Sequence, residues 1–304
     1  MEIGVFVKKV CNAVEQALGG EYSVECREVR KNNGVLLHGL TILPKHRNLS
    51  PTIYLDCFWE AYEAGMPFAS VIRRILAIYR EDMPREDIDM KFFQRFEGVK
   101  DRICYRLINR EENAELLEEI PHIEFLDLAV CFYYAYQSKM LGEGNILIDN
   151  SHMEMWRTST SELLELAQVN TPRLYPCLCL SMQEILHEVM GQEGRGGGTE
   201  FRDFRGIDIP MSVLSNAKRI HGAVCMLYPK VLEKLAAEWR ENFYILPSSI
   251  HEVILLKEAE AGPEAEGALK RMIVEINRTQ VAPEEVLSDH LYCYDFNEKK
   301  VRIV

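Results

Sequence analysis

The stretch that decides the fold runs from Phe243 to Leu256 and reads F-Y-I-L-P-S-S-I-H-E-V-I-L-L. Two short apolar runs, 243–246 and 253–256, flank a polar segment that contains proline, serine, histidine and glutamate. Short aliphatic and aromatic runs separated by turn-forming residues are typical of two strands joined by a tight connection. The stretch therefore predicts a β-hairpin whose connection carries polar side chains.

Short apolar runs and amphipathic segments also alternate on both sides of this hairpin, through the last hundred residues of the chain. The order of apolar runs and amphipathic segments is two strands, a helix, two strands, a helix and two strands. This order predicts an α+β fold with a mainly antiparallel sheet and helices largely on one face, and it argues against a doubly wound nucleotide-binding fold. The expected strands are 211–214, 223–227, 243–246, 253–256, 291–294 and 301–304, and the expected helices are 229–239 and 263–277.

The N-terminal part is expected to form a smaller unit of a helix, a hairpin, a strand and a helix. Its hairpin is indicated by Asn33-Gly34, because an Asn-Gly pair favours a tight turn between strands. An acidic segment with Pro84 follows, so we predict domains at 1–85 and 86–304, with one continuous domain as the alternative. The segments of the small unit are a helix at 5–18, strands at 22–30, 35–43 and 53–55, and a helix from Pro67.

The middle of the chain is expected to contain a strand at 102–108 and a long apolar strand at 124–136, with 145–148 returning beside it. Two capping boxes, Ser159 with Glu162 and Ser181 with Glu184, predict the starts of two helices. The first of these helices should end before Asn170-Thr171-Pro172, and the second at Gly191. The glycine-rich run 191–198 lacks the order of a phosphate-binding loop and is interpreted as a surface loop.

Composition narrows the classes of protein that the chain can represent. The chain has 304 residues and a formal net charge of -12, which disfavours nucleic acid as a partner. Its nine cysteines include no C-x-x-C pair, so we expect free thiols in a reducing cytoplasm and neither a metal nor another cofactor. No apolar run approaches the roughly 20 residues that span a bilayer, so no membrane association is expected.

Reactive side chains gather in the connection of the 243–256 hairpin and in the L-S-D-H segment near the C-terminus. The sequence excludes two catalytic interpretations, a zinc protease and a hydrolase with a nucleophile elbow. The His-Glu pairs lack the second histidine of a zinc protease helix, and no G-x-S-x-G elbow is present. The remaining catalytic candidates are Ser249, His251, Glu252 and Asp289, and the ligand-binding candidates are Asn170, Asn216, Ser248 and His290, with His221 as a further helper.

For each of these residues a purely structural role is the competing interpretation. The serines can shape the turn, His251 can bond a backbone carbonyl, and Asn170 can cap a helix end. Neighbouring residues of a regular strand face opposite sides, so His251 and Glu252 should not share one pocket. If the candidate segments are adjacent strand ends, however, they can form a single polar pocket.

A family resemblance rests on several of these segments. They include K-N-N-G-V at Lys31, N-T-P at Asn170, G-A-V-C-M-L-Y at Gly222, I-L-P-S-S-I-H-E-V-I-L at Ile245 and L-S-D-H at Leu287. Over nearly the whole chain the sequence resembles a bacterial family catalogued as domain of unknown function 5688. The resemblance implies a bacterial, soluble, intracellular protein, and it supplies no activity.

These observations lead to two hypotheses of different classes. The first is a non-enzymatic binding or regulatory protein, which uses the polar strand ends of its C-terminal sheet to hold a protein or a small polar ligand. The alternative is a hydrolase-like enzyme that uses His251 with Ser249 or Asp289. The oligomeric state is left open.

Overall fold

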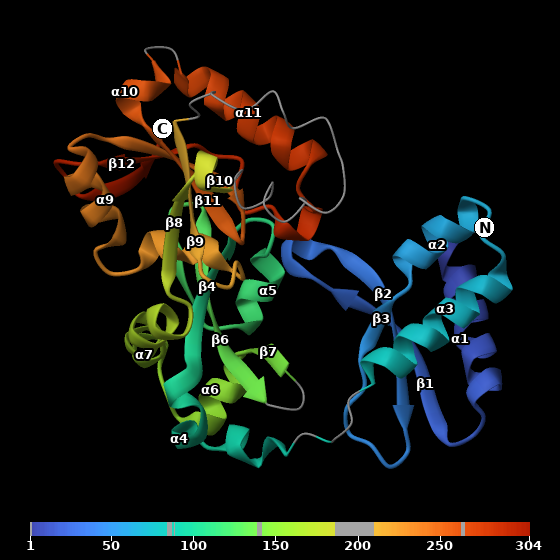
Figure 1. Ribbon diagram of the computed structural model, residues 1–304. Coiled ribbons are helices and arrows are strands. Elements are labelled where there is room, and N and C mark those ends of the chain that lie inside the picture. Colours follow the sequence, from blue (N-terminus) through green and yellow to red (C-terminus); the bar gives the residue numbers. More distant parts are fainter. Residues whose placement is uncertain (1, 84–86, 88, 139–141, 186–209, 263–264) are drawn as a thin grey trace. The chain divides into compact units, whose positions relative to one another are not determined.

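Figure 1 shows the computed structural model, which describes residues 2–83, 87, 89–138, 142–185, 210–262 and 265–304. The chain forms two compact units: unit 1 is Met1–Phe93 with Tyr136–Gly144, and unit 2 is Gln94–Ala135 with Asn145–Val304. Both units combine helices with antiparallel sheets, which confirms the predicted α+β class. The predicted boundary at residues 85 and 86 and the predicted loop 191–198 lie outside the described residues.

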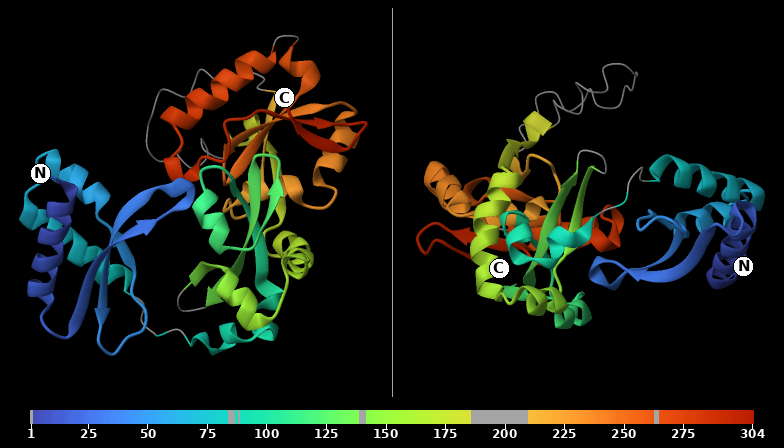
Figure 2. Two further views of the ribbon diagram at one scale, coloured as in Figure 1. Left: turned by 180° about the vertical axis from the view of Figure 1, so that it is seen from behind. Right: turned by 90° about the horizontal axis from the view of Figure 1, so that it is seen from below.

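Unit 1 is a three-stranded antiparallel sheet with helices packed on one face (Figure 1). Apolar residues of the first helix, such as Phe6 and Val10, meet Leu40 and Ile42 of the sheet and Ile75 of the last helix in one core. Figure 2 shows the same packing from behind. The elements are α1 (Ile3–Leu18), β1 (Tyr22–Arg30), β2 (Leu36–Pro44), β3 (Thr52–Tyr54), α2 (Asp56–Glu63) and α3 (Phe68–Asp82).

Unit 2 contains a four-stranded sheet in which β4, β6 and β5 are neighbours and β7 also pairs with β6. The single strand expected at 124–136 is wrong, because the chain turns at Leu126, whose φ is 56°, and at Asp127. The two halves of that apolar run pair with each other instead. The elements are α4 (Phe96–Val99), β4 (Ile103–Asn109), α5 (Ala114–Glu119), β5 (His122–Phe125), β6 (Leu128–Ser138), β7 (Gly142–Leu147), α6 (Asn150–Trp156) and α7 (Thr160–Leu174).

The helix α7 continues through Pro172, so the end expected before Asn170 is wrong. Side chains next to the proline bond to neighbouring elements and outweigh its cost to the helix. The Asn170 amide donates to the carbonyls of Lys100 and Ile103 at 2.8 and 3.1 Å. The Thr171 hydroxyl accepts the Tyr105 N–H at 3.2 Å. Asn170 therefore joins α7 to β4 and has a structural role.

The second sheet of unit 2 has six strands in the order β13-β12-β10-β11-β9-β8 (Figure 1). The strand expected at 223–227 is instead a 3-10 helix, and β8, which the sequence did not indicate, completes the sheet. The elements are β8 (Cys177–Ser181), β9 (Met211–Asn216), the 3-10 helix η5 (Gly222–Leu227), α9 (Val231–Trp239), β10 (Phe243–Ser249), β11 (Glu252–Lys257), α10 (Glu258–Ala261), α11 (Ala265–Thr279), the 3-10 helix η6 (Pro283–Glu285), β12 (Tyr292–Asp295) and β13 (Lys300–Ile303).

The predicted hairpin is confirmed as β10 and β11, and β10 is buried on both faces. One face, with Tyr244 and Leu246, packs against Leu269 and Ile273 of α11. Pro247 lies beyond the ladder with β12, where the register with β11 shifts, so its missing N–H breaks no central hydrogen bond. The turn that follows carries the candidate site.

Candidate functional site

His251 lies in the turn between β10 and β11 and has both ring nitrogens engaged. Its Nδ1 accepts the backbone N–H of His221 at 3.1 Å, and its Nε2 lies 3.5 Å from a Glu285 carboxylate oxygen. The backbone is held as well: the His251 N–H donates to Ser249 Oγ at 3.0 Å, and its carbonyl accepts the Ser215 hydroxyl at 2.7 Å. Because Nδ1 is an acceptor, the neutral ring carries its proton on Nε2.

The serines of the turn are not aligned with the imidazole. Ser249 is 9% exposed, and its hydroxyl oxygen accepts a backbone N–H, which is how serine stabilises a turn. Ser248 lies half-buried in the bulge. A serine nucleophile needs its hydroxyl bonded to the imidazole that takes its proton. Since both His251 nitrogens face other groups, the structure does not bring Ser249 and His251 together for hydrolysis.

Asn216 shapes the loop that presents His221 to His251. Its amide donates to the Ile220 carbonyl at 2.7 Å, and its Oδ1 accepts the Lys218 N–H at 3.0 Å. His221 then adopts a left-handed backbone with a φ of 52°, which places its N–H opposite His251. Asn216 is 1% exposed, so it shapes the loop and has no surface left for a ligand.

The His221 ring is enclosed between two other rings. It stacks on His251 with centroids 5.7 Å apart and an interplanar angle of 14°, and it lies 5.7 Å from the ring of Tyr133. Burial, then the charge of Arg106, then that of His251 lower the pKa of His221 to about 3. The ring is therefore neutral at physiological pH, and its Nδ1 is buried without a hydrogen-bond partner among the described residues.

This depressed pKa predicts acid-sensitive folding. Unfolded His221 takes up a proton near its usual pKa of 6.5, whereas folded His221 does not until about pH 3. Between these values the unfolded state binds more protons, so the free energy of unfolding falls as the pH falls. His221 should contribute a loss of about 2 kcal/mol between pH 7 and 5. Urea denaturation at each pH measures the loss.

The matched variants are His221→Asn, which suits the left-handed backbone, and His46→Asn at an exposed loop position. We expect His221→Asn to flatten the pH dependence between pH 7 and 5, and His46→Asn to leave it unchanged. An unaltered slope in His221→Asn would show that His221 is not the group that takes up the proton.

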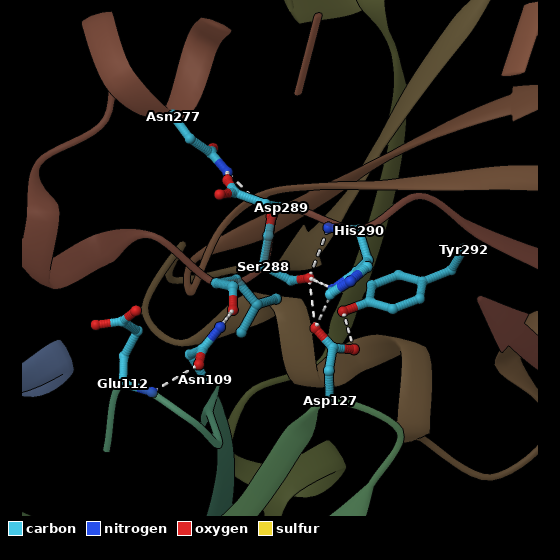
Figure 3. Close-up of polar contacts among 9 residues, drawn as sticks. Asn109, Glu112, Asp127, Asn277, Ser288, Asp289, His290 and Tyr292 are labelled. Atoms are coloured by element: carbon cyan, nitrogen blue, oxygen red, sulfur yellow. Dashed lines mark hydrogen bonds and ion pairs between the residues drawn. The ribbon is translucent and has the colours of Figure 1, made fainter. Parts of the chain in front are cut away.

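A second polar cluster surrounds Asp127, in the turn between β5 and β6 (Figure 3). Its carboxylate accepts the Ser288 hydroxyl at 2.6 Å and the Tyr292 hydroxyl at 2.8 Å, and its Oδ2 lies 3.1 Å from His290 Nδ1. Ser288 and Tyr292 are both 0% exposed, so Asp127 satisfies two buried hydroxyl groups. The pattern of the sequence did not single out Asp127, which lies inside an otherwise apolar run.

The Asp127 cluster does not have the geometry of a catalytic triad. In a triad one imidazole nitrogen faces the carboxylate and the other faces the serine. Here His290 Nδ1 lies near both Asp127 and Ser288, the latter at 3.5 Å, and the Ser288 hydroxyl donates to the carboxylate. The His290 side chain is 57% exposed, which leaves the ring within reach of solvent. The Ser288 hydroxyl is therefore not aligned as a nucleophile.

Asp289 and the rest of the L-S-D-H segment are held by asparagine side chains (Figure 3). The Asn277 amide donates to Asp289 Oδ1 at 2.8 Å and to the Ser288 carbonyl at 3.0 Å. The Asn109 amide donates to the Leu287 carbonyl at 3.1 Å. Asp289 is thus bonded to α11, and its segment belongs to the contacts around Asp127.

Glu252 belongs to a third feature, a cavity of about 220 Å³ on the sheet face that α11 covers in part. Strands β8, β9 and β11 supply its wall. Its lining is apolar apart from Ser215, Arg219 and Glu252, which lie at the same end of the antiparallel strands β9 and β11 or in the turn beyond it. The apolar lining residues are Leu178, Leu180, Met182, Ile185, Val213 and Ile254. Glu252 and His251 therefore have different surroundings, in line with the alternation expected of neighbouring residues.

The described residues contain no group of three or more His, Cys, Asp or Glu side chains that could hold a metal ion. Cys177 and Cys179 are free thiols in the structure, as are the other cysteines. No described helix has both the length and the apolar surface that crossing a lipid bilayer requires.

Comparisons with known proteins give a family and no activity. No curated protein and no solved structure matches the chain. The profile of a family described as a family of unknown function, DUF5688, matches residues 3–296, which is nearly the whole chain. The protein belongs to this family.

Proposed function

We propose that the protein is a non-enzymatic binding protein, which holds a small ligand in the cavity lined by β8, β9 and β11. The observation that carries this proposal is the cavity itself. It combines an apolar lining with a few polar groups at one end, the combination that is typical of small-molecule sites. Its polar end is built from the ends of strands: Ser215 belongs to β9, Arg219 lies in the turn after β9, and Glu252 begins β11.

Neither serine at the described candidate sites is aligned as a nucleophile, which supports binding over catalysis. The Ser249 and Ser288 hydroxyl groups bond to a backbone N–H and to a carboxylate, respectively. A ligand with an apolar body and a polar end would fit the lining. Its head group would meet either the Glu252 carboxylate or the Arg219 guanidinium, and this choice decides its charge.

The test uses three compounds that share an alkyl chain and differ in charge: hexanoate, hexanol and hexylamine. Binding is measured by NMR as shifts of the methyl resonances of Val213 and Ile254. We expect at least one compound to shift both resonances, with hexylamine favoured by Glu252 and hexanoate by Arg219. Val213→Phe fills the cavity and should abolish the shift of the Ile254 resonance, which this variant retains, whereas Val169→Phe at a position that is 68% exposed should not.

Two results would contradict the proposal. One is that none of the three compounds shifts the Val213 and Ile254 resonances of the folded protein. The other is a hydrolytic turnover that is lost in Ser249→Ala or His251→Ala while these variants stay folded. The second result would establish the hydrolase alternative instead.

A further inference from the structure

Arg106 lies in the middle of β4, and its neighbours on the same face of β4 and β6 are apolar or aromatic. The edge strand β5 adds His122 and Glu124 to this face. In the register of β4 with β6, Arg106 is opposite Cys131, and Cys104 is opposite Tyr133. Directly opposed and alternate residues share a face, so these four side chains lie on the same side of the sheet. Apolar clusters around Ile108 and around Tyr133 flank Arg106 on that side.

The Arg106 guanidinium has no counterion among the residues that the structure describes. Its Nε is buried without a hydrogen-bond partner, and no carboxylate pairs with the group. Burial lowers the pKa of the guanidinium, yet arginine remains protonated in proteins. A charge that is partly withdrawn from water and has no partner is costly, so this arginine favours an anion that balances it.

A second unsatisfied group lies beside this charge. Arg106 lies diagonally opposite Tyr133 in the register of β4 with β6, and the Tyr133 ring lies 5.7 Å from the His221 ring. The charge of Arg106 is also among the causes that lower the pKa of His221. The His221 Nδ1 is buried and lacks a partner among the described residues. The position of this ring is fixed by Tyr133 on one side and by His251 on the other. A cation and a neutral imidazole with unused hydrogen-bonding capacity therefore both lie next to Tyr133.

We propose that Arg106 and His221 form a binding site for a small oxyanion, the carboxylate or phosphate group of a metabolite, with His251 holding the His221 ring in place. A guanidinium matches both oxyanions with a pair of parallel N–H donors. Neutral His221 adds a third donor when its proton is on Nδ1. Arg106, His221 and His251 are all only partly buried, so solvent reaches the cluster.

Glu285 limits where the anion can lie. Its carboxylate engages His251 Nε2, and its carbonyl accepts the Ile250 N–H at 2.8 Å, which ties it to the β10–β11 turn. A negative charge on that side repels an incoming anion. The anion therefore binds on the Arg106 side of the His221 ring, where Tyr133 supplies the wall. This site is distinct from the apolar cavity and does not depend on the function proposed for it.

The test compares Arg106→Met with Arg110→Met in the full chain. Arg110 follows the same strand, is 43% exposed and pairs with Glu124, so it controls for the loss of a surface arginine. The probes are inorganic phosphate and acetate, with chloride at matched ionic strength as the reference. Readouts are the melting temperature and the NMR resonances of the His221 ring.

We expect phosphate, acetate or both to raise the melting temperature of the wild type and to shift the His221 resonances, whereas chloride does not. Arg106→Met should bind the same anion on the order of tenfold to a hundredfold more weakly, and Arg110→Met should match the wild type. If phosphate gives the response, the bound oxyanion is a phosphate group, and if acetate gives it, the bound oxyanion is a carboxylate.

The stability of the anion-free variants separates a binding role from a structural one. Methionine replaces an unpaired, partly buried cation with an apolar side chain, so Arg106→Met should melt no lower than the wild type. The proposal is overturned if neither anion shifts the His221 resonances, if Arg106→Met binds as tightly as the wild type, or if Arg106→Met melts well below the wild type.

Discussion

Gly222→Ala is expected to destabilise unit 2 by about 3 kcal/mol or more, because the site has no room for a methyl group. A Cβ at Gly222 would overlap Ser215 Oγ and the His251 carbonyl oxygen and would lie 2.8 Å from the Asn216 N. Two of these three atoms belong to the backbone and cannot turn away. Urea denaturation measures the loss, and the His221 and His251 resonances report whether the stacked rings separate.

Two further variants give this prediction a control. Gly20→Ala adds a methyl group where no atom lies within 4 Å, so the free energy of unfolding should change by less than about 0.5 kcal/mol. Adding Ser215→Ala to Gly222→Ala removes the hydroxyl and leaves both backbone overlaps, so it should restore only part of the stability. Full recovery in the double variant would show that the backbone contacts are not the obstacle.

Asp127→Ala is expected to cost about 3 to 5 kcal/mol of the free energy of unfolding of unit 2. The substitution removes the acceptor of the Ser288 and Tyr292 hydroxyl groups and of the His290 imidazole, at distances of 2.6 to 3.1 Å. Both hydroxyl-bearing residues are 0% exposed, so water cannot replace the carboxylate without local opening. Thermal and chemical denaturation measure the effect.

A double-mutant cycle with Tyr292→Phe tests the cause. Removal of the Tyr292 hydroxyl should cost less in the Asp127→Ala background than in the wild type, because its acceptor is already lost. Asp101→Ala, at an exposed carboxylate, should change the stability by no more than about 0.5 kcal/mol. Equal costs of Tyr292→Phe in both backgrounds would argue against the shared hydrogen bond.

Local signals account for the elements that the sequence predicted well. The apolar runs of Phe243–Leu256 determine the central hairpin. Consecutive side chains of a strand point to opposite faces, so a continuous apolar run is typical of a strand that is buried on both faces inside a sheet. The turn at Asn33 and Gly34 uses left-handed backbone, with φ values of 58° and 66°, as an Asn-Gly signal predicts. In both hairpins, residues that are close in sequence supply the interactions that decide the structure.

Contacts between distant segments explain the errors. The run 223–227 is as apolar as a strand, yet η5 packs between β4 and the strands β9 and β11, so its side chains are buried in a 3-10 helix. Pro172 remains inside α7 because Asn170 and Thr171 bond to β4. Such bonds join residues about 70 positions apart, as with Asn170 and Lys100, and leave no periodic pattern in the sequence.

The candidate sites divide in the same way. The concentration of polar residues at His251 and in the L-S-D-H segment was visible in the sequence. The partners that define their chemistry were not. Arg106 is a charged residue inside an apolar strand, and Asp127 lies in the turn that divides an apolar run. Their neighbours come from distant segments, as the contact of Asp127 with His290 shows. A charge within an apolar run was the available signal, and it indicates a buried polar network or a ligand.

The Asp127 hydrogen bonds also have a consequence for the order of folding. They join residues 161 and 165 positions apart, whereas β10 and β11 pair across a short turn. Contacts that close long loops carry a larger entropic cost and form slowly. We expect the hairpin to form early and the Asp127 contacts to close last, so the Asp127 cluster governs how slowly the folded unit opens more than how fast it forms.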